Sequence, residues 1–126
     1  MTGNEPKVRI DGIGGVFFRA KDPDALAAWY EEMFGITRVG EGLPWSQNEG
    51  FTVFSPFPAD TDYFGSSEQQ FMLNFRVDDL DTALASLGDA GVRIDEERQD
   101  EPYGRFAWVY DPEGNKIELW QPLGPS

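Results

Sequence analysis

An internal repeat limits what this chain of 126 residues can fold into. The segment FFRAKDPDALAA (17–28) aligns with NFRVDDLDTALA (74–85), and FTVFSP (51–56) aligns with IELWQP (117–122). In each copy an apolar run leads through an Asp into a helical pattern, and further strand-like runs follow. The repeat therefore predicts a single domain made of two βαβββ modules, at about residues 12–56 and 70–122.

The first module predicts one helix among three strands. Asp22 is a good N-cap, Pro23 suits a first helical turn, and Gly35 is a typical helix stop. The apolar residues between them recur at helical spacing: Leu26, Trp29, Tyr30 and Met33. Strands are expected at Ile13–Ala20, Ile36–Val39 and Phe51–Phe54.

The second module repeats this order and ends in a hairpin. Its helix is expected to begin at Asp79 as the N-cap. Strands are expected at 71–77, 92–99, 105–110 and 116–120. The turn Asp-Pro-Glu-Gly joins the last two, because Pro112 presets φ and Gly114 supplies a positive φ.

Two segments of this module resemble motifs of the vicinal oxygen chelate superfamily, which includes glyoxalase I, the extradiol dioxygenases and the bleomycin-resistance proteins. They are VDDLD (77–81) and YGRFAWVYDPEGNKIELWQP (103–122), and the resemblance extends from about Ile13 to Pro122. It implies an α+β fold in which two βαβββ modules form a cupped mixed sheet, with the site inside the cup. It also implies a homodimer, since pairing is common among such small chains.

The metal-dependent members of that superfamily hold their ion with side chains from the first and last strand of each module. The repeat places these four positions at Gly15, Thr52, Met72 and Glu118. Only Glu118 offers a charged oxygen, whereas a divalent ion takes three or more protein ligands in most sites. We therefore expect no classical metal site and no cofactor. Residues that could rebuild a metal site are Asn74, Glu49 and Asp62.

Composition narrows the chemistry further. The chain has no histidine and no cysteine, which removes the commonest general base, thiol nucleophiles and thiolate metal sites. Its net charge of -13 makes nucleic acid and anionic membranes poor partners, and is explained either by solubility or by attraction of a cationic small molecule. No apolar run approaches the ~20 residues of a membrane helix, and MTGNEPKVRI is unlike a signal peptide. A cytoplasmic protein is expected.

Glu118 is the candidate catalytic residue, because the resemblance implies that its side chain points into the cup. A carboxylate there must be solvated, paired or protonated, so an ion-paired structural role is the alternative. The candidate ligand-binding residues are Asn74, Arg19, Arg76, Thr52, Met72, Tyr103, Arg105, Trp45 and Tyr63. Arg19 and Arg76 hold equivalent repeat positions and are expected to line the cup as a pair.

Aromatic residues supply the remaining site candidates. Trp45 and Tyr63 lie in expected loops, where aromatic side chains frequently bind ligands. Trp108 and Trp120 lie on expected strands, which favours a core position over a ligand-binding one. The long loop 55–70 carries further aromatics, and the sequence leaves open whether it closes over the site.

Two functions remain. The first is a metal-free protein that binds a small organic molecule, cationic or aromatic, in the cup, as bleomycin-resistance proteins bind drugs. The alternative is a lyase, isomerase or dioxygenase related to glyoxalase I, in which Glu118 is a base whose pKa burial can raise into a useful range. The sequence provides no second acid–base partner for Glu118 at a convincing place.

Overall fold

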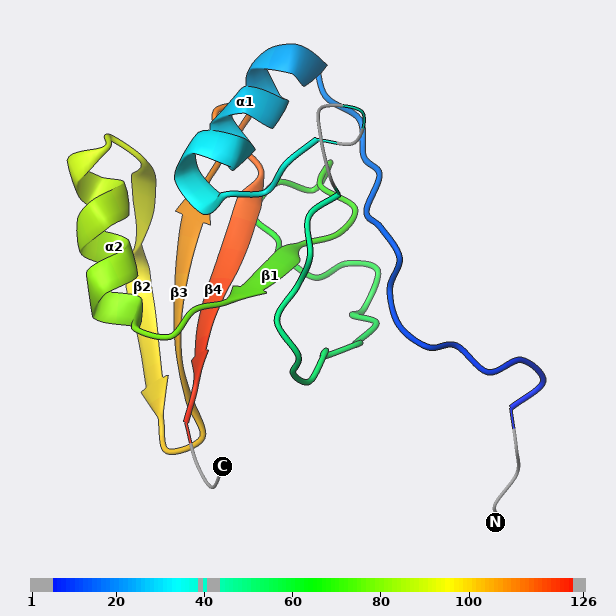
Figure 1. Cartoon of the computed structure of the whole chain (residues 1–126). Helices are drawn as coiled ribbons and strands as arrows, with labels where there is room; N and C mark the ends of the chain where they lie inside the picture. Colours follow the sequence, from blue (N-terminus) through cyan, green and yellow to red (C-terminus); the bar gives the residue numbers. More distant parts are fainter. Residues whose placement is uncertain (1–5, 39, 41–43, 124–126) are drawn as a thin grey trace.

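The computed structural model describes residues 6–38, 40 and 44–123. It is an α+β fold with one open, curved sheet of four strands in the order β1-β4-β3-β2 (Figure 1). The elements in chain order are α1 (Pro23–Phe34), β1 (Leu73–Arg76), α2 (Leu80–Asp89), β2 (Arg93–Glu101), β3 (Gly104–Tyr110) and β4 (Lys116–Pro122). β1 runs parallel to β4, and the other neighbours are antiparallel. No helix of the described residues is long and apolar enough to cross a membrane.

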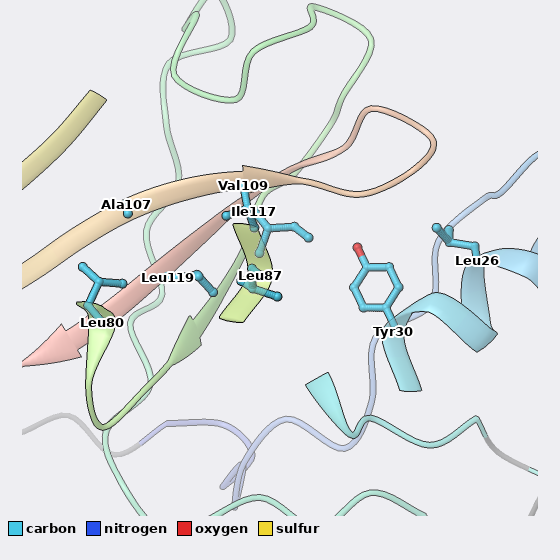
Figure 2. Close-up of a cluster of buried hydrophobic side chains, with 8 residues drawn as sticks. All are labelled: Leu26, Tyr30, Leu80, Leu87, Ala107, Val109, Ile117 and Leu119. Carbon is cyan, nitrogen blue, oxygen red and sulfur yellow. The ribbon is translucent and has the colours of Figure 1, made fainter. Parts of the chain in front are cut away.

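Both helices pack against one face of the sheet, and this packing forms the core. Figure 2 shows side chains of alternate positions on β3 and β4 meeting side chains from the two helices. The cluster contains Leu26 and Tyr30 of α1, Leu80 and Leu87 of α2, Ala107 and Val109 of β3, and Ile117 and Leu119 of β4. The alternation leaves the intervening side chains, including Trp108 and Glu118, on the opposite face.

The helix boundaries confirm the capping signals. The Asp22 carboxylate accepts a hydrogen bond from the Ala25 amide at 3.1 Å, and Gly35 ends α1 with φ of 70°. Asp79 caps α2 in the same way, through the Thr82 amide. Each cap satisfies an amide of the first helical turn that has no partner within the helix.

The hairpin between β3 and β4 forms as predicted, with Gly114 at φ of 85°, and it also anchors α1. The carboxylate of Asp111 is 4 % exposed and accepts hydrogen bonds from the Tyr30 hydroxyl at 2.8 Å and the Asn115 amide at 3.0 Å. The carboxylate of Glu113 accepts from the amides of Lys21 and Asp22. The acidic residues of this turn therefore fix the position of α1 on the sheet.

The prediction of strands in the first module is wrong for the described residues. Among the described residues, 13–20, 36–38 and 51–54 belong to no strand, and position 39 lies outside the described residues. Phe51 and Val53 are 89 % and 67 % exposed, whereas their repeat equivalents Ile117 and Leu119 are fully buried. An apolar pattern predicts that a strand could pair, but a strand needs a neighbour, and these segments have none in the described chain.

The second module has the predicted βαβββ order, with small shifts at the ends. β1 is shorter than the expected 71–77, and β2 and β4 each extend two residues beyond their expected ends. β1 pairs only with β4 in the part of the chain that the structure describes, so its outer edge carries no strand.

Candidate functional site

The sheet register brings three polar side chains into one row on the face opposite the helices. Asn74 of β1 lies beside Glu118 of β4, which lies beside Trp108 of β3. Directly opposed residues of neighbouring strands point to the same face, with Cβ atoms about 4.5–5.5 Å apart. The fold therefore assembles this row from residues 44 positions apart in the sequence.

The Glu118 carboxylate accepts three hydrogen bonds from neutral donors. Asn74 Nδ2 donates to Oε1 at 2.5 Å. The hydroxyl of Tyr63 and Nε1 of Trp108 both donate to Oε2, at 2.5 and 3.0 Å. Glu118 is only 8 % exposed, and no Lys or Arg of the described residues forms an ion pair with it. Neutral donors satisfy the oxygens of this group and leave its charge without a counter-ion.

Tyr63 reaches Glu118 from the segment that precedes β1, which we call the 57–69 loop. The Tyr63 ring stacks on Phe57 with centroids 5.3 Å apart and meets Trp108 edge-on at 6.0 Å. Lys116 Nζ donates to the Tyr63 carbonyl at 3.0 Å and lies 5.4 Å from the centre of its ring. The loop is thus closed over Glu118, which answers the question that the sequence left open.

The side chain of Gln69 fastens the other end of this loop to the sheet. Its amide nitrogen donates to the carbonyls of Lys116 and Phe71, both at 2.9 Å, and its amide oxygen accepts from the Lys116 amide at 2.8 Å. The side-chain amide thereby pairs with both backbone groups of Lys116, as a neighbouring strand would. No local pattern around Gln69 indicates this contact, because a Gln in a polar loop has the same sequence context whether or not it bonds to a strand.

Burial, and next the hydrogen bond to Glu118, raise the pKa of the Tyr63 hydroxyl well above its ordinary value of 10.0. Burial and the Asp111 carboxylate raise the pKa of Tyr30 in the same direction. Both phenols therefore stay protonated at neutral pH. Tyr63 remains a hydrogen-bond donor to Glu118 under those conditions.

These two shifts predict a loss of stability in alkali. Tyrosines of the unfolded chain release their protons near pH 10, whereas Tyr30 and Tyr63 of the folded chain keep theirs. Raising the pH above 10 therefore stabilises the unfolded state relative to the folded state. We expect the free energy of unfolding to fall from pH 10 upward, with Tyr30 contributing about 1.4 kcal/mol per pH unit. Urea unfolding between pH 8 and pH 11 measures this. A Tyr30→Phe chain that declines as steeply as wild type would contradict it.

A pocket of about 960 Å³ lies beside this cluster. Its walls come from the segment Val53–Phe64 on one side and from the sheet on the other. The sheet side consists of Met72, Asn74, Phe106, Glu118 and Trp120, with Tyr103 at the β2–β3 turn. The rings of Phe106 and Trp120 are parallel, with an interplanar angle of 3° and centroids 6.3 Å apart. The pocket therefore combines a polar end at Glu118 with an aromatic wall.

The structure brings some of the sequence candidates to this pocket: Glu118, Asn74, Met72, Tyr63 and Tyr103. It places others elsewhere. Arg19 lines a second pocket of about 530 Å³ beside Tyr30 and Lys116. Thr52 is exposed, and Trp45 packs edge-on against Phe75. Arg105 lies 3.7 Å from the carboxylate of Asp81 in α2, toward the helical side.

Arg76 lies on the same sheet face as Asn74, but it bonds to backbone carbonyls and not to the pocket. Its guanidinium donates to the carbonyls of Asn48 and Glu49, at 3.0 and 3.4 Å. A Cβ at position 50 would overlap this guanidinium, so a larger residue there would require the Arg76 side chain to shift. Arg19 lines the second pocket and Arg76 bonds to the 48–49 backbone, so neither of the expected pair lines the pocket beside Glu118.

Sequence reasoning passed over Phe106, Lys116 and Gln69. The period of two along a strand could have found the first two, because Phe106 lies two residues before Trp108 and Lys116 two before Glu118, so each shares its neighbour's face. Trp108 is buried, as its strand position suggested, but it is buried on the cup face and bonded to Glu118.

The donor set does not suit a metal ion. Of the four positions that correspond to metal ligands, Gly15 has no side chain, Thr52 is exposed and Met72 is a soft thioether. Glu118 already accepts from three donors, and Asn74 is one of them. Within residues 6–38, 40 and 44–123, no group of three or more His, Cys, Asp or Glu is placed to hold a metal.

The parallel β1–β4 pair, the crossover through α2 and the site on the face opposite the helices define a glyoxalase-like α+β domain. The chain belongs to the Glyoxalase/Bleomycin resistance protein/Dioxygenase superfamily, whose family model matches residues 12–119. Among curated proteins, none shows significant similarity to this chain.

Several solved structures are similar to this chain. A lactoylglutathione lyase from Agrobacterium tumefaciens is 19 % identical, with a TM-score of 0.57 over 89 % of this chain and 94 % of the lyase. TioX from Micromonospora sp. ML1 is 22 % identical, with a TM-score of 0.52 over 82 % and 93 %. TnmS3, an antibiotic binding protein from Streptomyces sp. CB03234, is 28 % identical, with a TM-score of 0.49 over 80 % and 87 %. The first two likenesses show the fold and leave the ligand of this chain open.

Proposed function

We propose that this chain is a binding protein for a small organic molecule with an aromatic ring system, held without a metal in the pocket beside Glu118. The observation that carries the proposal is the composition of the pocket. It has an aromatic wall that includes Phe106 and Trp120, and a single buried carboxylate at one end. Ligand sites commonly combine apolar walls with a few fixed polar groups of this kind.

The charge of the chain affects which molecules approach this pocket. A net charge of -13 attracts cations at long range and disfavours nucleic acid and anionic membranes. Close to Glu118, the Lys116 ammonium lies 5.4 and 5.5 Å from the ring centres of Tyr63 and Trp108, which opposes a second cation there. The proposal therefore includes cationic aromatic molecules and does not require a positive charge.

The test is a titration with three naphthalene probes: 2-naphthol, 2-methoxynaphthalene and 2-naphthylmethylammonium. The readout is the indole N–H resonances, one from each tryptophan. Saturable shifts are expected at Trp108 and Trp120, which lie at the site, and not at Trp29, a residue of α1 that packs against the core. Absence of any saturable shift, or equal shifts at Trp29, would contradict a ligand site in this pocket.

The second candidate is an enzyme related to glyoxalase I, a lyase, isomerase or dioxygenase that uses Glu118. One contact favours it. The Tyr63 hydroxyl on Glu118 Oε2 supplies a proton-carrying partner for the carboxylate, which sequence reasoning could not find. A carboxylate and a phenol within hydrogen-bond distance can serve as a general base and a general acid. Turnover in lyase, isomerase or dioxygenase assays that is lost on Glu118→Gln would favour this candidate over simple binding.

We further propose that the chain acts in the cytoplasm as a homodimer. The support is apolar surface in the first module: Phe17, Phe51 and Phe54 are 91, 89 and 87 % exposed. Contact with a second copy of the chain would bury such side chains, and exposed apolar patches commonly mark interfaces. Light scattering is expected to give about twice the 14.2 kDa mass of one chain, and a monomer at micromolar concentration would contradict the dimer.

A further inference from the structure

Tyr63 gives the pocket an aromatic ring of its own. The residue comes from the 57–69 loop and not from the sheet, yet its hydroxyl donates to the carboxylate at the polar end of the pocket. Its ring lies against Phe57 on one side and meets the edge of Trp108 on another. The chain therefore holds a phenol in an aromatic setting, with the hydroxyl on a buried carboxylate.

The same contacts describe how a free phenol would bind here. Trp108 and Asn74 donate to Glu118 from strands of the sheet, whose ladders hold them independently of the loop. Only the third donor, Tyr63, comes from a loop, so it is the one that a ligand can replace. A hydroxyl on an aromatic ring would restore the lost hydrogen bond and the ring contacts together.

We propose that Tyr63 occupies the place of the ligand's ring in the free protein, and that the pocket takes an aromatic molecule bearing a phenolic hydroxyl, which displaces Tyr63 from Glu118. This proposal rests on the binding function proposed above. It asks for a neutral hydroxyl donor, because all three donors that satisfy Glu118 in the structure are neutral and the one from the loop is a phenol. Lys116 also places a positive charge in front of the rings of Tyr63 and Trp108, so the site does not depend on a cation of the ligand.

The loop is tied down in a way that permits such an exchange. Gln69 fixes its end to Lys116 and Phe71, and Lys116 Nζ holds the carbonyl of Tyr63. Between these points, Gly65 has a φ of 85°, a conformation that glycine adopts without strain. The ring of Tyr63 competes with a ligand as a tethered group, so its presence reduces the apparent affinity.

The test compares the affinity of 2-naphthol for wild type, Tyr63→Phe and Tyr110→Phe. Tyr63→Phe removes the internal hydroxyl and keeps the ring, so we expect it to bind 2-naphthol about tenfold more tightly than wild type, as the strength of a hydrogen bond to a charged group suggests. Tyr110→Phe is the matched control. It also loses a hydroxyl bonded to a carboxylate, that of Asp95, outside the pocket, and its affinity is expected to equal that of wild type.

The probe 2-methoxynaphthalene has the same ring system and cannot donate a hydrogen bond. We expect its affinity to change little between wild type and Tyr63→Phe. Hydrogen exchange at the Gly65 amide, which bonds to the Asp62 carbonyl at 3.1 Å, gives an independent readout. The exchange is expected to quicken when 2-naphthol binds to wild type, because the loop is released.

Three results would overturn the proposal. If Tyr63→Phe binds 2-naphthol no more tightly than wild type does, Tyr63 lines the pocket or contacts the ligand and does not compete with it. An equal gain for 2-methoxynaphthalene would show that the donor to Glu118 is not used. Both results would leave the binding function standing. Failure of every probe to bind wild type and both variants would instead contradict the binding function itself.

Discussion

Asp111→Ala is expected to lower the free energy of unfolding by about 3 kcal/mol. The Asp111 carboxylate accepts from the Tyr30 hydroxyl, the amides of Glu113 and Asn115, and Asn115 Nδ2, at 2.8 to 3.0 Å. Its removal leaves a buried phenol without an acceptor and loosens the turn that holds α1 on the sheet. A lost partner costs more than the hydrogen bond is worth, because the remaining donor stays buried and unpaired.

Urea unfolding at neutral pH measures this effect. Tyr30→Phe is the matched variant: it removes one hydrogen bond and leaves the turn intact, so we expect a smaller loss of about 1 kcal/mol. An Asp111→Ala loss no larger than that of Tyr30→Phe would show that the turn holds its shape without the carboxylate.

Glu118→Ala is expected to cost about 3 kcal/mol as well, for the same reason on the opposite face of the sheet. The change leaves the indole N–H of Trp108, the Asn74 amide and the Tyr63 hydroxyl without their acceptor. Glu118→Gln keeps the shape and one acceptor oxygen, so a loss of about 1–2 kcal/mol is expected.

Ligand binding separates the two roles of this residue. Glu118→Gln is expected to bind 2-naphthol about tenfold more weakly than wild type, because a neutral acceptor replaces a charged one. A Glu118→Ala chain more stable than wild type would indicate a carboxylate retained at a cost to stability, as in a catalytic site, and would favour the enzyme candidate.

Local signals in the sequence were sufficient for both helices and for the strands of the second module. Caps at Asp22 and Asp79, the turn at Pro112–Gly114 and strand alternation around Glu118 all specify their own elements, because each depends on residues close together in the chain. The resemblance to the superfamily and the α+β fold were confirmed. The resemblance, and not a local pattern, turned Glu118 toward the cup, and in the structure its side chain lies on the sheet face opposite the helices.

Contacts between distant segments were not predictable in this way. Nothing local to Tyr63 indicates that it reaches Glu118, 55 residues away, and nothing local to Gln69 indicates its bonds to Lys116. The prediction of strands in the first module was wrong for a related reason. Val53 and Phe54 have the apolar character of a strand, but pairing depends on a partner that the described chain does not supply.

The central claim is that three neutral side chains, and not a metal ion, satisfy the Glu118 carboxylate. The most direct measurement is the metal content of protein purified without an affinity tag, together with thermal unfolding in added Ni²⁺, Zn²⁺, Mn²⁺, Fe²⁺ and Mg²⁺. We predict far less than one ion per chain and no stabilisation by any of the five. Close to one ion per chain, lost on Glu118→Ala, would contradict the claim.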